Sequence, residues 1–144
     1  MEAEVATMEV TVQHLGSVQF EIRAREHMIV SDQPEENHGF DEGMTPPELF
    51  LASLGSCAAY YAAEYLRQKN LATEGTRVVV HAEKIVKPAA RLDNFRIEVE
   101  LPMACDERDR EGVDRAVHRC LIHNTLLQPP AMEIVVHAPA VDRV

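Results

Sequence analysis

The sequence predicts an α+β protein whose strands and helices follow the order βββ-α-ββ-α-β, with antiparallel sheets. Two observations support this prediction. Segments that alternate apolar and polar residues come in consecutive runs, whereas a parallel βαβ sheet would alternate them one by one with helices. Between these runs lie two segments with helical spacing of apolar residues, one of them apolar on nearly every face. We expect residues 1–144 to form one domain.

The first three strands are expected before residue 32. Met8–Gln13 and Val18–Arg25 both alternate, and Gly16 is available for a turn between them, so this pair is predicted to form an antiparallel hairpin. His27–Ser31 is expected as the third strand. Residues 32–46 then form a polar, acidic loop with two glycines and two prolines, which is typical of a segment flanking a functional site.

A long helix is expected to begin at Thr45 or Pro46 and to end near Asn70. The sequence Thr-Pro-Pro-Glu supplies a capping side chain, prolines suited to a first helical turn, and a carboxylate near the positive end of the helix. Because its first four turns are almost entirely apolar, this helix must be buried on most sides. A second helix with a wrapping sheet, or a dimer partner, is needed to cover it.

The remaining elements are predicted from the same patterns. Thr76–Val86 alternates and is expected to pair with Phe95–Leu101 as a second hairpin. Residues Asp106–Ile122 carry an apolar stripe at helical spacing, after an acidic start, and predict the second helix. Met132–His137 is expected to be the final strand.

Charge and hydropathy exclude several classes of function. The chain has 24 acidic and 14 basic residues, a net charge of -10, which opposes binding to nucleic acid or to an anionic membrane surface. The most apolar run, residues 49–63, is shorter than the ~20 residues that a membrane-spanning helix needs. The acidic N-terminus lacks the basic region of a secretory signal. We therefore expect a soluble, cytoplasmic protein with no nucleic-acid or membrane partner.

Cys57 is the first candidate for chemistry. The chain has three widely spaced cysteines, which do not form a secreted disulfide framework. Cys57 lies about three turns inside the long helix, too far from its N-terminus for the helix dipole to lower the thiol pKa much. A reactive thiolate there needs a cation from elsewhere, such as Arg23, Arg25, Arg119 or a histidine. The alternative is a small core residue packed against a second helix.

Cys120 is the second candidate, because it falls on the apolar stripe of the predicted second helix. Two helices with one inward cysteine each could bring two thiols together, as peroxide-reacting and resolving cysteines require. Cys105 is expected to be an incidental thiol at a strand end. Cys120 and His123 have a spacing that suits two metal ligands, but zinc sites usually show two such pairs, so no metal is expected.

Two motifs together resemble the OsmC/Ohr family, the osmotically inducible protein C and organic hydroperoxide resistance proteins. The first is GMTPPELFLASLGSC, with a helix start followed by Cys57, and the second is HRCLIHNTLLQPPAMEIVV, with Cys120 before an Asn-Thr-Leu segment and a final strand. The order of elements also fits, so the resemblance covers nearly the whole chain. The first motif is closer to the less characterised OsmC-like branch.

The resemblance implies an intertwined homodimer in which antiparallel sheets wrap two central helices, with active sites at the subunit interface. It also implies thiol-dependent reduction of organic hydroperoxides, an oxidoreductase activity of the peroxidase type. Carried over, Cys57 would attack the peroxide and Cys120 would resolve the product to a disulfide. An external dithiol or lipoyl-type reductant would then restore the thiols, and no bound cofactor is expected.

The sequence departs from the family pattern beside the thiol. Well-characterised reductases of this family have a glutamate ten residues before the first cysteine, but Pro47 stands there and Glu48 is nine residues before Cys57. The first hairpin lacks the arginine that pairs with this glutamate. Glu48, Arg23 and Arg25 are therefore the supporting candidates. The alternative function is a non-enzymatic binder of a small hydrophobic ligand in the interface cleft between Cys57 and Cys120.

Overall fold

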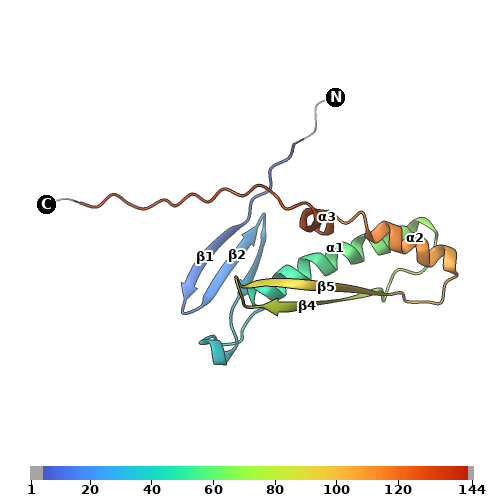
Figure 1. Cartoon of the computed structure of the whole chain (residues 1–144), viewed down its shortest axis with the longest axis horizontal. Coiled ribbons are helices and arrows are strands. Elements are labelled where there is room, and N and C mark those ends of the chain that lie inside the picture. The colour runs from blue at the N-terminus through green and yellow to red at the C-terminus, as the bar shows by residue number, and fades with distance from the viewer. Residues whose placement is uncertain (1–4, 143–144) are drawn as a thin grey trace.

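The computed structural model describes residues 5–142 and shows a mixed α+β fold with two antiparallel sheets and three α-helices (Figure 1). The elements in chain order are β1 (Thr11–Gly16), β2 (Gln19–Ala24), β3 (His27–Ser31), a 3₁₀ turn η1 (Glu35–Asn37), α1 (Pro46–Gln68), β4 (Arg77–Ile85), β5 (Arg91–Glu100), α2 (Glu107–Val117) and α3 (Leu121–Leu127). The α+β class and the antiparallel sheets are confirmed. The order of the first six predicted elements is also confirmed.

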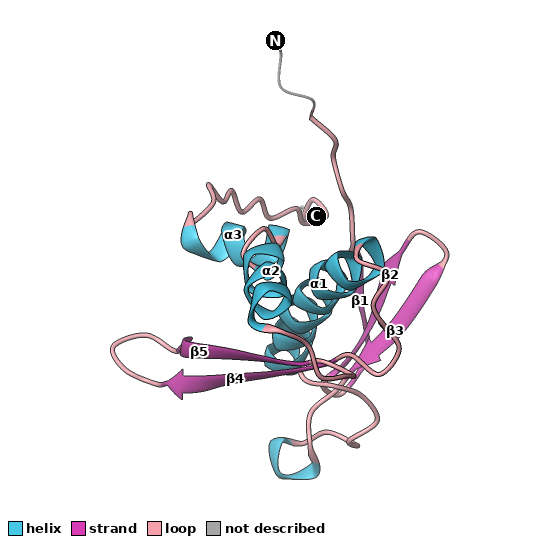
Figure 2. Ribbon diagram, turned by 90° about the vertical axis from the view of Figure 1, so that its right-hand side faces the viewer, coloured by secondary structure: helices cyan, strands magenta, loops and turns pink. Residues whose placement is uncertain are grey.

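The strands form two separate sheets (Figure 2). Strands β1, β2 and β3 pair in that order as an antiparallel meander, and β4 pairs with β5 as a hairpin. Within the described chain, α1 packs mainly on β4, β5, α2 and α3, whereas the strands of the three-stranded sheet pack mainly on one another. The three-stranded sheet therefore does not share the core of its own chain.

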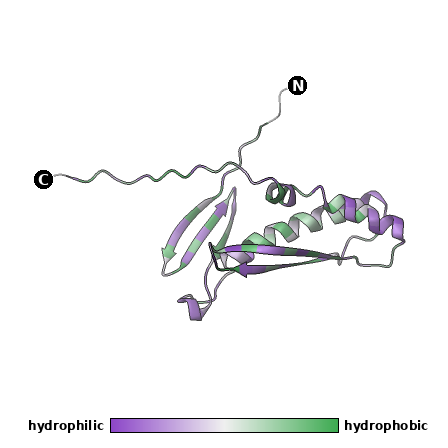
Figure 3. Cartoon of the chain, viewed as in Figure 1, coloured by the Kyte–Doolittle hydropathy of each residue, from purple (hydrophilic) through white to green (hydrophobic). Residues whose placement is uncertain are grey.

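That core lies where α1 meets α2 and the β4–β5 hairpin. Ala62 and Leu66 of α1 pack on Val113 of α2, and partly buried residues of β5 and the neighbouring loops surround them. Figure 3 shows α1 in pale to green colours and α2 mostly in purple, which matches a central helix covered by an amphipathic one. The small side chains of α1 allow this close packing.

The loop after β3 is organised by a buried carboxylate. Asp32 is 1% exposed, and its side chain accepts hydrogen bonds from Gln19 Nε2 (2.9 Å) and from the backbone N–H groups of Gln33 (2.7 Å), Glu42 (3.1 Å) and Phe40 (3.2 Å). Burial alone would raise the pKa of Asp32, but these hydrogen bonds outweigh it and lower the pKa below its usual value. The acidic loop is thus held against β2 just before α1 begins.

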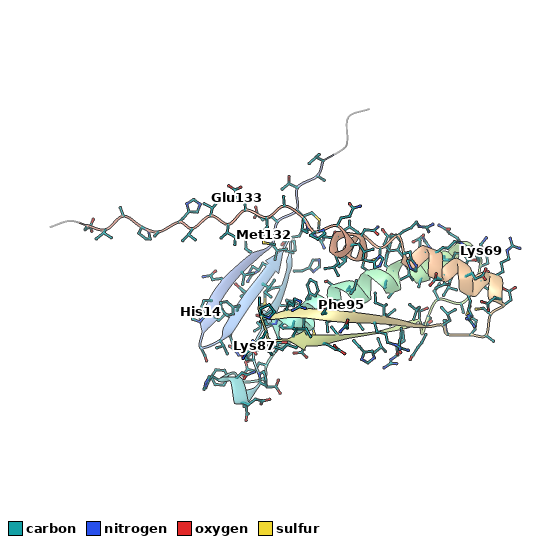
Figure 4. All side chains as sticks on the ribbon, viewed as in Figure 1. His14, Lys69, Lys87, Phe95, Met132 and Glu133 are labelled. Atoms are coloured by element: carbon teal, nitrogen blue, oxygen red, sulfur yellow. The ribbon has the colours of Figure 1, made fainter. Side chains whose placement is uncertain are left out.

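One predicted element is shorter than expected and another is missing. The helix expected over Asp106–Ile122 ends at Val117, where the backbone tightens to hydrogen bonds between residues three apart, and a separate helix α3 starts at Leu121. The strand expected at Met132–His137 is absent, because this segment pairs with no strand among residues 5–142. It runs outward as an exposed, extended segment (Figures 1 and 4), and Figure 4 labels Met132 and Glu133 on it.

Candidate functional site

Cys57 is placed by α1, a helix whose start is strongly determined. Thr45 caps the helix by accepting from the backbone N–H of Glu48, while the Glu48 carboxylate accepts from the N–H (3.0 Å) and hydroxyl (2.7 Å) of Thr45. This reciprocal capping box satisfies backbone groups that a helix end otherwise leaves unpaired. Cys57 follows in the third turn and is half-buried, beside the buried residues Leu54 and Ala58.

Gly55 sets the depth at which this part of α1 sits on the sheet. A Cβ atom built at Gly55 would lie 3.0 Å from Cγ2 of Val80 on β4, which is closer than side chains normally pack. The helix backbone can therefore rest directly on β4 at this turn. This close approach holds the turn that carries Cys57 against β4.

Cys120 is placed by the break between α2 and α3. It caps α3 with an extended backbone (φ -57°, ψ 127°) and has 0% exposure. Its side chain makes no capping hydrogen bond to the first turn of α3. Cys120 is thus buried, as the sequence predicted, but it lies at a helix cap and not on the stripe of a continuous helix.

The two thiols are brought together. The Cys57 thiol lies close enough to Cys120 to affect the pKa of that thiol. Burial raises the pKa of Cys120 and the Cys57 thiol raises it further, while the amides of Ile122 and His123 act in the opposite direction. The pair therefore consists of a buried cysteine that favours its protonated form and a more accessible cysteine beside it. Such a pair can exchange between two thiols and one disulfide.

The supporting candidates are not brought to Cys57 within this chain. The Glu48 carboxylate is engaged in the capping box at the start of α1. Arg23 on β2 forms an ion pair with Glu21 (2.6 Å), and Arg25 lies exposed in the turn between β2 and β3. Over residues 5–142, no hydrogen bond or ion pair joins either arginine to Cys57. Neither Arg23 nor Arg25 therefore supplies a cation to Cys57 from within the described chain.

Cys105 lies apart from the pair, half-buried in the connection between β5 and α2. Nothing in the described chain links it to Cys57 or Cys120. No group of three or more side chains with metal-ligating atoms gathers anywhere between residues 5 and 142. Cys120 and His123, whose spacing resembles a ligand pair, thus have no third such side chain gathered with them.

A pocket of about 720 Å³ lies next to the thiol pair, between β5 and the helices α2 and α3. Leu54, one turn before Cys57, and His123, three residues after Cys120, both line it, although neither cysteine does. Its other walls are apolar residues of β5 with the ends of α2 and α3: Phe95, Ile97, Val99, Leu101, Val113, Val117, Leu126 and Leu127. The sequence analysis missed this pocket, although the alternation along β5 indicates its apolar wall.

One polar atom in this wall lacks a partner. His123 Nδ1 is buried and makes no hydrogen bond with any described residue, while its ring packs edge-on against His118 at 5.6 Å between centroids. Buried polar atoms are nearly always hydrogen-bonded, and an exception often indicates a missing ligand or water. The rim carries both charge signs, with Glu107, Glu111 and Asp114 near Arg110.

The sequence profile of the family described as OsmC-like protein matches residues 39–135, which include both cysteines of the pair. The chain belongs to this family. No protein of curated function matches the sequence. None of the helices between residues 5 and 142 is long and apolar enough to cross a bilayer.

Solved structures of low sequence identity share the fold. A Psychrobacter arcticus protein named for an osmotic stress and detoxification response has a TM-score of 0.74 at 19% identity, covering 87% of this chain and 91% of that one. An OsmC-like protein from Mycoplasma pneumoniae has a TM-score of 0.69 at 20% identity, covering 86% and 89%. An organic hydroperoxide resistance protein from Elizabethkingia anophelis has a TM-score of 0.66 at 16% identity, covering 89% and 93%. These likenesses show that the chain shares the fold of these proteins over most of its length.

Proposed function

We propose that this OsmC-like protein reduces organic hydroperoxides through Cys57, with Cys120 as the resolving cysteine. The observation that carries the proposal is the closeness of two thiols, one half-buried and one fully buried, where the Cys57 thiol helps to raise the pKa of Cys120. Membership of the OsmC-like family and the fold shared with an organic hydroperoxide resistance protein point the same way. We place the reaction in the cytoplasm, where a reducing environment keeps thiols available.

Exposure decides which cysteine attacks. Cys120 has no exposed surface and a raised pKa, so it is poorly suited to meet a peroxide from solution. Cys57 is half-buried and borders the apolar side chain of Leu54. In the first step the Cys57 thiolate attacks the distal peroxide oxygen, the O–O bond breaks, and the leaving alkoxide takes a proton to become an alcohol. Cys57 becomes a sulfenic acid.

The second step uses the neighbouring thiol. The sulfur of Cys120 attacks the sulfenic sulfur of Cys57, the S–O bond breaks, and the hydroxide leaves as water with the proton from Cys120. The disulfide that forms holds two oxidising equivalents. An external dithiol, for which a lipoyl-type group is the expected form, reduces it through a mixed disulfide and restores both thiols.

The working form is proposed to be a homodimer, because large apolar surfaces of this chain have no cover within it. Val12, Phe20, Ile22 and Ile29 share one face of the three-stranded sheet by their pairing register, and three of them are exposed. A soluble protein rarely leaves such a face open. A second copy would cover this face and would bring its own Arg23 or Arg25 within reach of a Cys57 thiolate.

The test is hydroperoxide consumption coupled to a dithiol. Wild-type protein should consume cumene hydroperoxide far faster than the free dithiol does, and Cys57→Ser should abolish this activity. Cys105→Ser, the matched control, should retain it. Cys120→Ser should still react once and leave a sulfenic acid that dimedone traps. Wild-type turnover no faster than that of the free dithiol would refute the proposal.

The pocket beside the pair favours a second candidate function, non-enzymatic binding of a small hydrophobic ligand. Its volume of about 720 Å³ lies within the range of small-molecule sites, and its walls are mainly apolar with one unpaired histidine nitrogen. The sequence analysis expected a binding cleft between the two thiols. The pocket instead lies beside them. Ligand binding that survives Cys57→Ser, in a protein without peroxidase activity, would favour the binder.

A further inference from the structure

The pocket beside the thiol pair has one polar region, at the junction of α2 and α3. His118 Nδ1 donates a hydrogen bond to the backbone carbonyl of Asp114 (2.7 Å) and lies 3.6 Å from the carboxylate of the same residue. The ring of His118 packs edge-on against that of His123, with 5.6 Å between the centroids. All three residues line the pocket, so one carboxylate and two imidazoles form a continuous polar group in its wall.

The wall along β5 is apolar. Alternate residues of β5 and the residue after it line the pocket with Phe95, Ile97, Val99 and Leu101. A cavity of about 720 Å³ with an apolar wall and few polar groups is typical of a small-molecule site. The buried Nδ1 of His123 has no partner among residues 5–142, and a polar head group on the ligand would satisfy it. These features together fit an amphiphile with one polar head.

The charges around the pocket select the kind of head group. Three carboxylates line it, those of Glu107, Glu111 and Asp114, and the one guanidinium is that of Arg110. Arg110 pairs with Glu107 (3.6 Å), so no lysine or arginine of the pocket offsets the other two carboxylates. The site therefore repels an anionic head group and attracts a cationic one.

We propose that this pocket binds a cationic amphiphile, a primary alkylamine, with its ammonium group beside Asp114 and His123 and its alkyl chain along β5. An ammonium offers N–H donors to the Asp114 carboxylate. It also offers one to His123 Nδ1, which accepts when the proton of the neutral ring is on Nε2. The alkyl chain gains free energy by leaving water for the apolar wall.

This inference deepens the second candidate function and rests on it, because it requires the pocket to hold a small ligand. It does not depend on the peroxide chemistry, since neither cysteine lines the pocket. The surfaces proposed for the homodimer are the open face of the three-stranded sheet and the segment beyond α3. Neither surface is part of the pocket wall, so a dimer formed through them does not by itself fill the pocket.

The experiment is calorimetric titration of the full-length reduced protein at low salt and pH 7, without peroxide, with octylamine, octanol and octanoate. Octylamine should bind once per chain and about tenfold or more tighter than octanoate, with octanol between them. Higher ionic strength should reduce this preference, because salt screens the charges at the rim. Decylamine should bind tighter than octylamine by about fourfold for each added CH₂ group.

Matched variants separate the charge of the pocket from that of the whole chain. Asp114→Asn should weaken octylamine binding by about tenfold and leave octanol binding unchanged, which also shows that the pocket is intact. Glu74→Gln removes the same charge at an exposed position outside the pocket and should bind like the wild type. His123→Phe keeps a ring but removes Nδ1, and should weaken octylamine binding.

The outcomes distinguish the amine site from the binder function. Equal affinities for octylamine and octanoate, or wild-type preference in Asp114→Asn, would overturn the amine site and leave the pocket as a binder of small hydrophobic molecules. No binding of any of the probes, as expected if a second copy filled the pocket, would overturn both.

Discussion

Cys57 in α1 lies close enough to Cys120, the N-cap of α3, to raise the pKa of that thiol, although the whole β4–β5 hairpin and all of α2 lie between them in the sequence. The position of Cys120 depends on the end of α2 at Val117. If α2 continued through Cys120, this residue would lie inside a helix and not at the N-cap of α3. Gly55 lets α1 approach β4 closely, and this packing positions Cys57 two residues further along the helix. Oxidation of these thiols to a disulfide should therefore link α1 covalently to the N-cap of α3.

Oxidation of the pair should stabilise the protein. A disulfide between Cys57 and Cys120 would close a loop of about 60 residues, for which loss of entropy in the unfolded chain contributes about 4 kcal/mol. We expect the free energy of unfolding of the peroxide-treated protein, measured in urea without reductant, to exceed that of the reduced protein by up to this amount. Cys57→Ser should show no such difference. Equal urea midpoints for the oxidised and reduced wild type would contradict the disulfide.

Much of the fold could be predicted because its signals are local. The start of α1 is indicated within four residues by Thr45, Pro46 and Glu48, and the helix begins there in the structure. The break before Cys120 has no local signal, since it arises where the chain packs against α1. The strand at Met132–His137 was predicted from its pattern, but a strand also requires a partner strand, and the described part of the chain pairs none with it.

The candidate site could likewise be predicted only in part from the sequence. Both cysteines could be singled out from the sequence, yet only packing brings their sulfurs together. The supporting role expected of Arg23 overlooked a local competitor, because Glu21 lies two residues away on the same face of β2 and pairs with it. Glu48 likewise has a local partner in Thr45.

The role of Glu48 can be tested through its capping box. Thr45→Ala should lower the free energy of unfolding by about 1 kcal/mol, since α1 loses its N-cap side chain. Glu48→Ala should also lower the thermal midpoint, and neither variant should reduce hydroperoxide turnover per folded molecule. A large fall in turnover for Glu48→Ala with an unchanged thermal midpoint would instead assign Glu48 to the thiol site.

Asp32→Asn should destabilise the protein in a pH-dependent way. The native pKa of Asp32 lies below its ordinary value of 3.8, so the carboxylate contributes stability above that pH and loses this contribution as the pH falls through the native pKa. We expect Asp32→Asn to have a lower urea midpoint than the wild type at pH 7. The two midpoints should converge at the lowest pH at which the protein remains folded. A difference that does not change with pH would show that shape and not charge matters here.

Gly112 in α2 is predicted to be intolerant of alanine. A Cβ atom at Gly112 would overlap the ring of Tyr65, whose hydroxyl donates a hydrogen bond to Asp109 (3.0 Å) and so holds the ring over α2. Alanine normally favours a helix by about 1 kcal/mol over glycine, but overpacking should reverse this and cost roughly 1–3 kcal/mol. Glu111→Ala, at the exposed neighbouring position, should change stability little. The penalty at Gly112 should disappear in a Tyr65→Ala background, as a double-mutant cycle in urea would measure.

The extended segment beyond α3 should be needed for assembly and not for folding of the single chain. Ile134 and Val136 point to the same side of an extended chain and are 82% and 86% exposed. Their joint replacement by glutamate removes burial only if a second copy covers them. The free energy of dimerisation should then become less favourable by roughly 3 kcal/mol or more, which makes the dimer about 100-fold weaker. Light scattering coupled to size-exclusion chromatography should show the double variant as a monomer with unchanged helical circular dichroism. Val141→Glu, at an equally exposed position outside the expected strand, should remain a dimer. If the double variant stays dimeric at micromolar concentration, the subunits associate through another surface, for which the open face of the three-stranded sheet is the next candidate.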